Sequence, residues 1–145
     1  MSPMSRPTIV LDTNVVLDWL LFDDRSVHAL AAAVESRRVD WIATAEMRDE
    51  LAHVLARGLA EQRGVVPETV LAAFDARVRR VPTPHPFPPG WLCSDPDDQK
   101  FVDLARDAGA HWLLSRDRAV LKLARQARGA GWQIVTPSVW SETAC

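Results

Sequence analysis

The chain is poor in the features that mark several classes of protein. It has only two cysteines, Cys93 and Cys145, and neither has a partner at the spacing of a zinc site, so we expect no disulfide framework and no zinc. No apolar run approaches membrane-spanning length, and Met1–Pro7 lacks the apolar core of a signal peptide. The sequence therefore predicts a cytoplasmic protein with no membrane partner.

Glycine motifs and a strong basic charge are missing as well. The six glycines are scattered and form neither a dinucleotide-binding fingerprint nor a phosphate-binding P-loop. The net charge of −2 supplies no global field to attract nucleic acid, although a local patch would suffice. Fifteen arginines stand against two lysines, which suits bidentate phosphate contacts but fits a compositional bias equally well.

Strand-like and helix-like segments alternate along the chain, and its 145 residues are expected to form a single domain, 1–145. The expected strands are Thr8–Leu11, Val39–Ala43, Arg80–Val81, His111–Ser115 and Trp132–Val135. The expected helices are Thr13–Leu21, Ser26–Arg37, Thr44–Arg57, Pro67–Arg79, Asp95–Ala108 and Arg118–Arg128. This alternation favours an α/β fold, a parallel sheet covered on both faces by helices.

Two segments interrupt this pattern. Gly58–Gly64 indicates a break or frayed end after the third helix. Pro82–Gly90 contains too many prolines for a helix or a central strand, so we expect a loop on the surface of the domain.

Four acidic residues are expected at one edge of this sheet. Asp12 and Asp117 follow two apolar strands, at whose carboxyl ends such folds place their sites. Glu50 and Asp98 belong to helices and lie at or near the apolar face that packs toward the sheet.

Each acid also has a simpler explanation. Asp12 and Asp117 could be N-caps of the helices that follow them. Asp98 stands three residues after Asp95 in a helix start, with Pro96 at the first position, a place typical of a capping box. Glu50 could be a surface residue at the margin of an apolar stripe.

The set indicates more than its members do, because four clustered carboxylates repel each other. No lysine or arginine is expected among them, so a cation must compensate, and carboxylate oxygens favour Mg²⁺ or Mn²⁺. The sequence therefore predicts a metal-dependent enzyme that cleaves phosphodiester bonds.

Four segments together resemble the PIN-domain family, over about Thr8 to Val139. They are Ile9–Asn14, Glu50–Leu55, Asp95–Phe101 and Trp112–Asp117, in matching order and approximate spacing. The chain is most similar to the PIN-type toxins of toxin–antitoxin modules, related to the VapC-type toxins. One departure is Ser94, where the resemblance leads us to expect a basic residue.

The resemblance implies a three-layer α/β/α fold whose five-stranded parallel sheet has the order 3-2-1-4-5. It also implies a Mg²⁺- or Mn²⁺-dependent ribonuclease, with an RNA substrate and a small antitoxin protein as partner. Asp12, Glu50, Asp98 and Asp117 match the catalytic, metal-binding quartet. Thr13, Asn14 and Ser115 match the accessory polar positions, and Asp95 is an extra accessory acid at the rim of the site.

Two other functions compete with this interpretation. One is a PIN-like binding module with little activity, which the intact quartet disfavours. The other is a structure-specific DNA nuclease, for which 145 residues leave little room. The sequence leaves open the RNA target and the oligomeric state, a homodimer included.

The six tryptophans are expected mainly in the core and at interfaces. Trp91 could instead stack on a base near the acidic site, but packing of the loop against the domain is the preferred interpretation.

Overall fold

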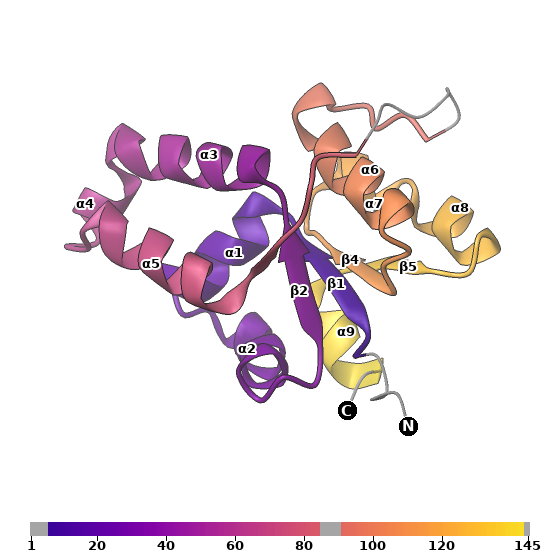
Figure 1. Cartoon of the computed structure of the whole chain (residues 1–145), viewed down its shortest axis with the longest axis horizontal. Helices are drawn as coiled ribbons and strands as arrows, with labels where there is room; N and C mark the ends of the chain where they lie inside the picture. The colour runs from indigo at the N-terminus through magenta and orange to yellow at the C-terminus, as the bar shows by residue number, and fades with distance from the viewer. Residues whose placement is uncertain (1–5, 85–90, 144–145) are drawn as a thin grey trace.

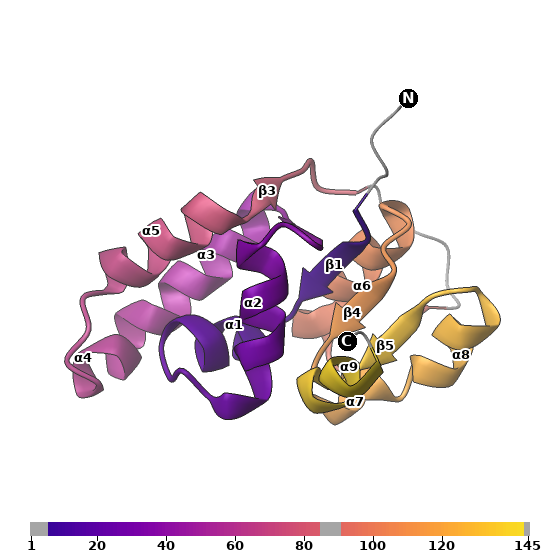
Figure 2. The ribbon, with the colours of Figure 1, turned by 90° about the horizontal axis from the view of Figure 1, so that it is seen from below.

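The computed structural model of the chain describes residues 6–84 and 91–143. Its centre is a sheet of five parallel strands in the order β3-β2-β1-β4-β5. The strands are β1 (Thr8–Leu11), β2 (Asp40–Ala43), β3 (Arg79–Arg80), β4 (Trp112–Leu114) and β5 (Gln133–Val135). Helices lie on both sides of the sheet (Figures 1 and 2), so the expected three-layer α/β/α fold with order 3-2-1-4-5 is confirmed.

The helices fall into two groups by position in the chain. The first group is α1 (Thr13–Leu20), η1 (Arg25–Val27), α2 (His28–Glu35), α3 (Ala45–Val54), η2 (Leu55–Leu59), α4 (Ala60–Gln62) and α5 (Pro67–Arg77). The second group is η3 (Pro96–Asp98), α6 (Gln99–Asp107), α7 (Arg118–Leu121), α8 (Ala124–Gly129) and α9 (Pro137–Thr143). No helix in the described part of the chain is long and apolar enough to cross a membrane.

The register between β1 and β4 determines which polar residues lie next to each other after the two strands end. β1 is fully buried from Ile9 to Leu11, and Leu11 pairs with Leu114 of β4. The chain continues this pairing by one step, because the amide of Asp12 donates to the carbonyl of Leu114 over 3.1 Å. Asp12 and Ser115, the next residues along the two strands, therefore stand side by side at the carboxyl edge of the sheet.

The break expected at the end of the third helix is confirmed at Gly58, whose non-helical geometry kinks the chain inside η2. Helical structure resumes after this kink and ends at α4, which was not expected. Gly58 changes the direction of the chain with φ of +100°, which a residue without a side chain adopts freely. Leu55 and Ala60 on either side of it are fully buried, and this packing holds the extra turns in place.

Two further differences concern the C-terminal part. The helix expected over Arg118–Arg128 is divided into α7 and α8, because Leu123 leaves helical geometry with φ of −89° and ψ of 0°. α9 was not expected at all. The Thr136 hydroxyl accepts from the amide of Val139 at its start, and Trp140, 3% exposed, anchors it in the core.

The proline-rich segment lies partly outside the described residues. Residues 82–84 form neither helix nor strand, as expected, and the edge strand before them is Arg79–Arg80 instead of Arg80–Val81. Residues 85–90 are outside the described part of the chain, so the expected surface loop stays a prediction there.

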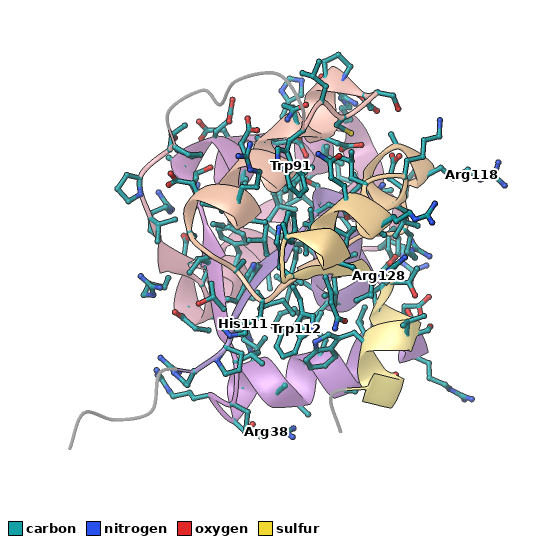
Figure 3. The ribbon with its side chains drawn as sticks, turned by 90° about the vertical axis from the view of Figure 1, so that its right-hand side faces the viewer. Arg38, Trp91, His111, Trp112, Arg118 and Arg128 are labelled. Carbon is teal, nitrogen blue, oxygen red and sulfur yellow. The ribbon has the colours of Figure 1, made fainter. Side chains whose placement is uncertain are left out.

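Most of the tryptophans pack as expected. Trp19, Trp41, Trp132 and Trp140 are buried, and Trp112 contacts Trp140 edge to face at 5.6 Å. Trp91 is half-buried and stacks on Trp132 with ring centroids 5.5 Å apart, on the side of the molecule that Figure 3 shows. This contact supports the packing interpretation of Trp91.

Candidate metal centre

An acidic cleft of about 240 Å³ opens at the carboxyl edge of β1 and β4. Its lining consists of Asp12, Thr13, Asn14, Glu50, Val54, Arg57, Asp95, Asp97, Asp98 and Asp117. Seven of the eight residues expected at the site belong to this lining. The eighth, Ser115, contacts two of the acidic residues from the end of β4.

Asp12 occupies the most buried position of the cleft, with 2% of its surface exposed. One carboxylate oxygen accepts from the amide of Val15 at 3.0 Å, and the other accepts from the hydroxyl of Ser115. Burial raises the pKa of Asp12 to about 6, although these two hydrogen bonds oppose the rise. Asp12 is therefore both the N-cap of α1 and a part of the cleft, so the two interpretations hold together.

Asp117 combines the same two roles on the neighbouring strand. Its carboxylate caps α7 by accepting from the amide of Ala119 at 2.8 Å. Its own amide donates to the hydroxyl oxygen of Ser115 at 2.9 Å, while that hydroxyl donates to Asp12. Ser115 thus connects the two strand ends through one side chain.

Three carboxylates come closest to one another in this cleft. One ligand oxygen each from Asp95, Asp98 and Asp117 lies within 4.8 Å of the other two. Asp95 also caps η3 by accepting from the amide of Asp97 at 3.0 Å. The close group therefore includes an acid that we expected only as an accessory, and it does not include Asp12 or Glu50.

Asp98 carries the strongest sign of an uncompensated charge. Its Oδ2 atom is buried and has no hydrogen-bond partner among the described residues. Asp98 precedes α6 as its N-cap residue, but its side chain makes no capping hydrogen bond there. Burial and the neighbouring charge of Asp117 raise the pKa of Asp98 to about 7.

Glu50 differs from the three aspartates of the quartet because one of its oxygens contacts a cation. Thr13 donates its hydroxyl to Oε2, and the ammonium of Lys100 lies 2.5 Å from Oε1. The expectation that no lysine or arginine lies among the four acids is therefore wrong. Lys100 follows Asp98 by two residues on the next helix, a proximity in sequence that could have signalled it.

Arg57 is a second cation that the sequence interpretation missed. It lines the cleft, and its side chain is exposed. It follows Glu50 by seven residues, two helical turns, which places both residues on one face of the helix. That spacing was the available signal.

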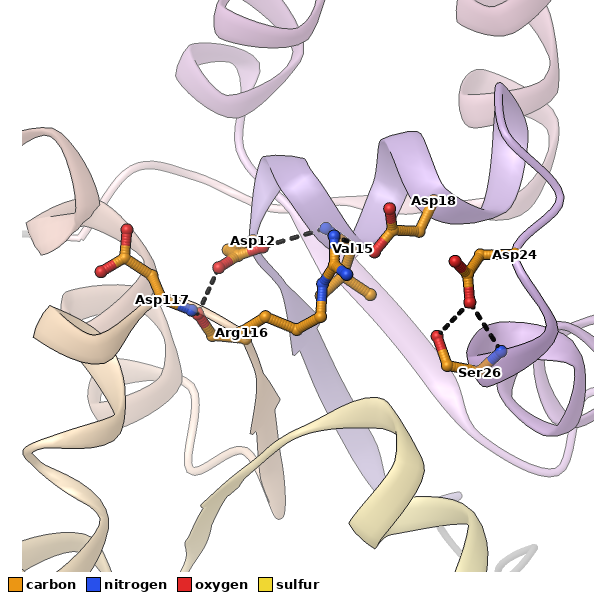
Figure 4. Close-up of polar contacts among 8 residues, drawn as sticks. Asp12, Val15, Asp18, Asp24, Ser26, Arg116 and Asp117 are labelled. Carbon is orange, nitrogen blue, oxygen red and sulfur yellow. Dashed lines mark hydrogen bonds and ion pairs between the residues drawn. The ribbon is translucent and has the colours of Figure 1, made fainter.

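Arg116, beside Asp117, reaches away from the acidic group. Its guanidinium lies 2.7 Å from the carboxylate of Asp18, a buried residue of α1 (Figure 4). Burial raises the pKa of Asp18, and the charge of Arg116 opposes this rise. Arg116 is thus engaged in neutralising an acid outside the cleft.

The donor set of the cleft fits a hard divalent cation. Carboxylate oxygens dominate the lining, with no sulfur or imidazole among the lining residues, and Mg²⁺ and Mn²⁺ prefer such oxygen ligands. The buried oxygen of Asp98, unpartnered among the described residues, is the kind of atom that such an ion would satisfy.

A parallel α/β protein with an acidic cleft at the carboxyl edge of its sheet is the class that these observations define. Residues 8–119 match the PIN domain family, and the chain belongs to that family. A chain in the crystal structure of VapBC2 from Rickettsia felis, bound to a DNA fragment from its promoter, has the same fold with a TM-score of 0.60. The two are 13% identical, and the match covers 88% of this chain and 96% of that one. A comparison with curated protein sequences finds no match.

Proposed function

We propose that the protein is a metal-dependent endoribonuclease and the toxin of a type II toxin–antitoxin module. It hydrolyses RNA phosphodiester bonds with Mg²⁺ or Mn²⁺ held by Asp12, Glu50, Asp98 and Asp117. The observation that carries this proposal is the group of carboxylates within 4.8 Å around Asp98, whose buried oxygen has no partner among the described residues. Membership in the PIN domain family, whose members are generally nucleases, supports it.

Each residue has a role that follows from its contacts. Asp98 and Asp117, together with the nearby Asp95, present converging oxygens to a cation. Ser115 fixes the position of Asp12, whose carboxylate it bonds. A divalent cation in this group would neutralise charge on the phosphate and activate water for attack.

A small antitoxin protein is the proposed partner, and the cytoplasm the proposed location. The similar fold in VapBC2 supports the choice of partner. We expect a basic side chain of the antitoxin to enter the acidic cleft, because it would neutralise the carboxylates as a cation does. If the purified complex cleaved RNA as fast as the free protein, this form of inhibition would be wrong.

The proposal is tested by comparing metal binding and RNA cleavage in three proteins. Asp98→Asn removes one charge from the close group, and Asp107→Asn removes an exposed charge at the end of α6, the helix that follows Asp98. We expect Mn²⁺ titration by calorimetry to show binding to the wild type and to Asp107→Asn but much weaker binding to Asp98→Asn, with cleavage following the same order. Equal Mn²⁺ affinity in all three would reject the proposed metal centre.

A further inference from the structure

Lys100 and Glu50 form an ion pair between two helices at the edge of the acidic cleft. The ammonium of Lys100, on α6, lies 2.5 Å from Oε1 of Glu50, on α3. It also donates to the backbone carbonyl of Asp97. The two side chains are only 16% and 27% exposed, so this pair is better shielded from solvent than an ordinary surface pair.

Other cations near the cleft do not contact the four acids in this way. Within residues 6–84 and 91–143, Lys100 is the one cation that forms an ion pair with Asp12, Glu50, Asp98 or Asp117. Arg116 pairs with Asp18 instead. Lys100 is not among the residues that line the cleft, so its ammonium neutralises Glu50 without filling the space beside Asp98 and Asp117.

We infer that Lys100 is a built-in counter-cation, which neutralises Glu50 in the metal-free protein and releases it when a divalent cation binds. This inference rests on the metal centre of the proposed function. Glu50 already has a partner at each oxygen, so its full charge becomes available to a metal only if the ammonium moves away. The four-carbon stem of lysine allows that movement, and its compact ammonium forms no rigid fork with the carboxylate.

Two opposite consequences follow for the free protein. Lys100 lowers the affinity of the cleft for metal, because it competes for Glu50. It also stabilises the metal-free fold, because it reduces the repulsion among the carboxylates. A residue that merely positioned Glu50 for the metal would raise the affinity instead, so the sign of the effect separates the two roles.

The first experiment measures Mn²⁺ affinity by calorimetry in Lys100→Met, which keeps a long apolar side chain without the charge. We expect this variant to bind Mn²⁺ on the order of ten-fold more tightly than the wild type and to unfold at a lower temperature without metal. Lys100→Arg, which retains the charge, should bind Mn²⁺ no more tightly than the wild type, because the guanidinium also competes for Glu50. Lys122→Met is the matched control, because Lys122 is exposed and is the only other lysine of the chain. Unchanged or weaker binding by Lys100→Met would overturn the inference.

The second experiment observes Lys100 directly and does not depend on the stability of a variant. Reductive methylation with ¹³C-labelled formaldehyde keeps the charge of lysine, and the methyl signals come from the two lysines and the N-terminal amine, so Lys100→Met and Lys122→Met assign the two lysine signals. During Mg²⁺ titration we expect the Lys100 signal to shift in a saturable way while the Lys122 signal stays constant. In Asp98→Asn the shift should be lost.

The outcomes separate this inference from the proposed function. If calorimetry shows metal binding that depends on Asp98 but the Lys100 signal does not move, the counter-cation role is wrong and the metal centre stands. If the wild type binds neither Mn²⁺ nor Mg²⁺, both are wrong.

Discussion

Two charged hollows at opposite edges of the sheet differ in whether their acidic residues are paired with cations. The acidic cleft lies beyond the carboxyl edge of the sheet, and a larger cavity of about 540 Å³ lies near the amino end of β2. The larger one is lined by Arg6, Val34, Glu35, Arg37, Val39, Asp40, Trp41, Ala76, Arg77, Val78 and Arg79. Two of its four arginines are neutralised within the lining, because Arg79 lies 2.7 Å from Asp40 and Arg77 lies 3.3 Å from Glu35.

The comparison teaches that charge balance, and not volume, distinguishes the candidate site. In the arginine-lined cavity, the hydrogen bond to Asp40 raises the pKa of Arg79 and so favours the charged form. In the acidic cleft, burial raises the pKa values of Asp12 and Asp98 to about 6 and about 7, so the charged forms are disfavoured. In the larger cavity both acidic residues are paired with arginines, whereas in the smaller cleft, of the four expected metal ligands, only Glu50 forms an ion pair among the described residues.

The largest expected effect is on catalysis. Asp117→Asn should reduce RNA cleavage by about 1,000-fold. The substitution removes a negative charge that would help to hold the cation, and the cation would neutralise the charge that develops on the phosphate. Asp40→Asn removes a carboxylate from the arginine-lined cavity and should leave cleavage unchanged. Single-turnover rates at saturating Mn²⁺ measure both. If both variants lost cleavage rate equally, the acidic cleft would not differ in function from the arginine-lined cavity.

The next effect concerns the stability of the metal-free protein as a function of pH. Because the pKa values of Asp12 and Asp98 are raised in the folded state, the folded protein binds more protons than the unfolded chain between about pH 4 and 7. This stabilisation is fully present below pH 4 and is lost as the pH rises toward 7. The change of the Asp12 pKa from 3.8 to about 6 corresponds to a loss of at most about 3 kcal/mol in the free energy of unfolding.

Chemical denaturation at several pH values in the presence of a chelator measures this dependence. Asp98→Asn should flatten the decline and stabilise the metal-free protein at pH 7, while Asp40→Asn should lower stability by about 1 kcal/mol or less through the loss of a partly exposed pair. Mg²⁺ should restore the stability of the wild type at pH 7. A wild-type protein whose stability does not decline from pH 4 to 7 would contradict the raised pKa values.

The sequence was sufficient for the parts of the molecule that follow from local patterns. The apolar run Thr8–Leu11 predicted β1 at its observed bounds, and helix periodicity placed Glu50 at the half-buried margin of α3. Asp12 and Asp117 were expected either as caps or in the site, and the structure shows both roles at once.

What the sequence could not predict depends on contacts between distant elements. The pairing of Lys100 with Glu50 joins residues on α6 and α3, and no spacing rule relates them. Helical structure resumes after the kink at Gly58, where Ala60 is fully buried in the core. α9 is short, and Trp140 at its centre is buried in the core.

The smallest expected effect separates substrate binding from metal binding within the acidic cleft. Arg57 is an exposed cation in a lining that is mostly acidic, where it can contact an RNA phosphate that the carboxylates would repel. Arg57→Gln should raise the KM for RNA by about 3- to 10-fold, as expected for one exposed charge-assisted contact, and should leave Mn²⁺ affinity nearly constant.

Arg6→Gln, which removes an exposed arginine from the other cavity, is the matched control and should change neither quantity. The KM of the wild type should also depend more steeply on salt than that of Arg57→Gln, because one phosphate contact is lost. If Arg6→Gln raised the KM as much as Arg57→Gln, RNA would contact the arginine-lined cavity as well, and the assignment of RNA binding to the acidic cleft alone would fail.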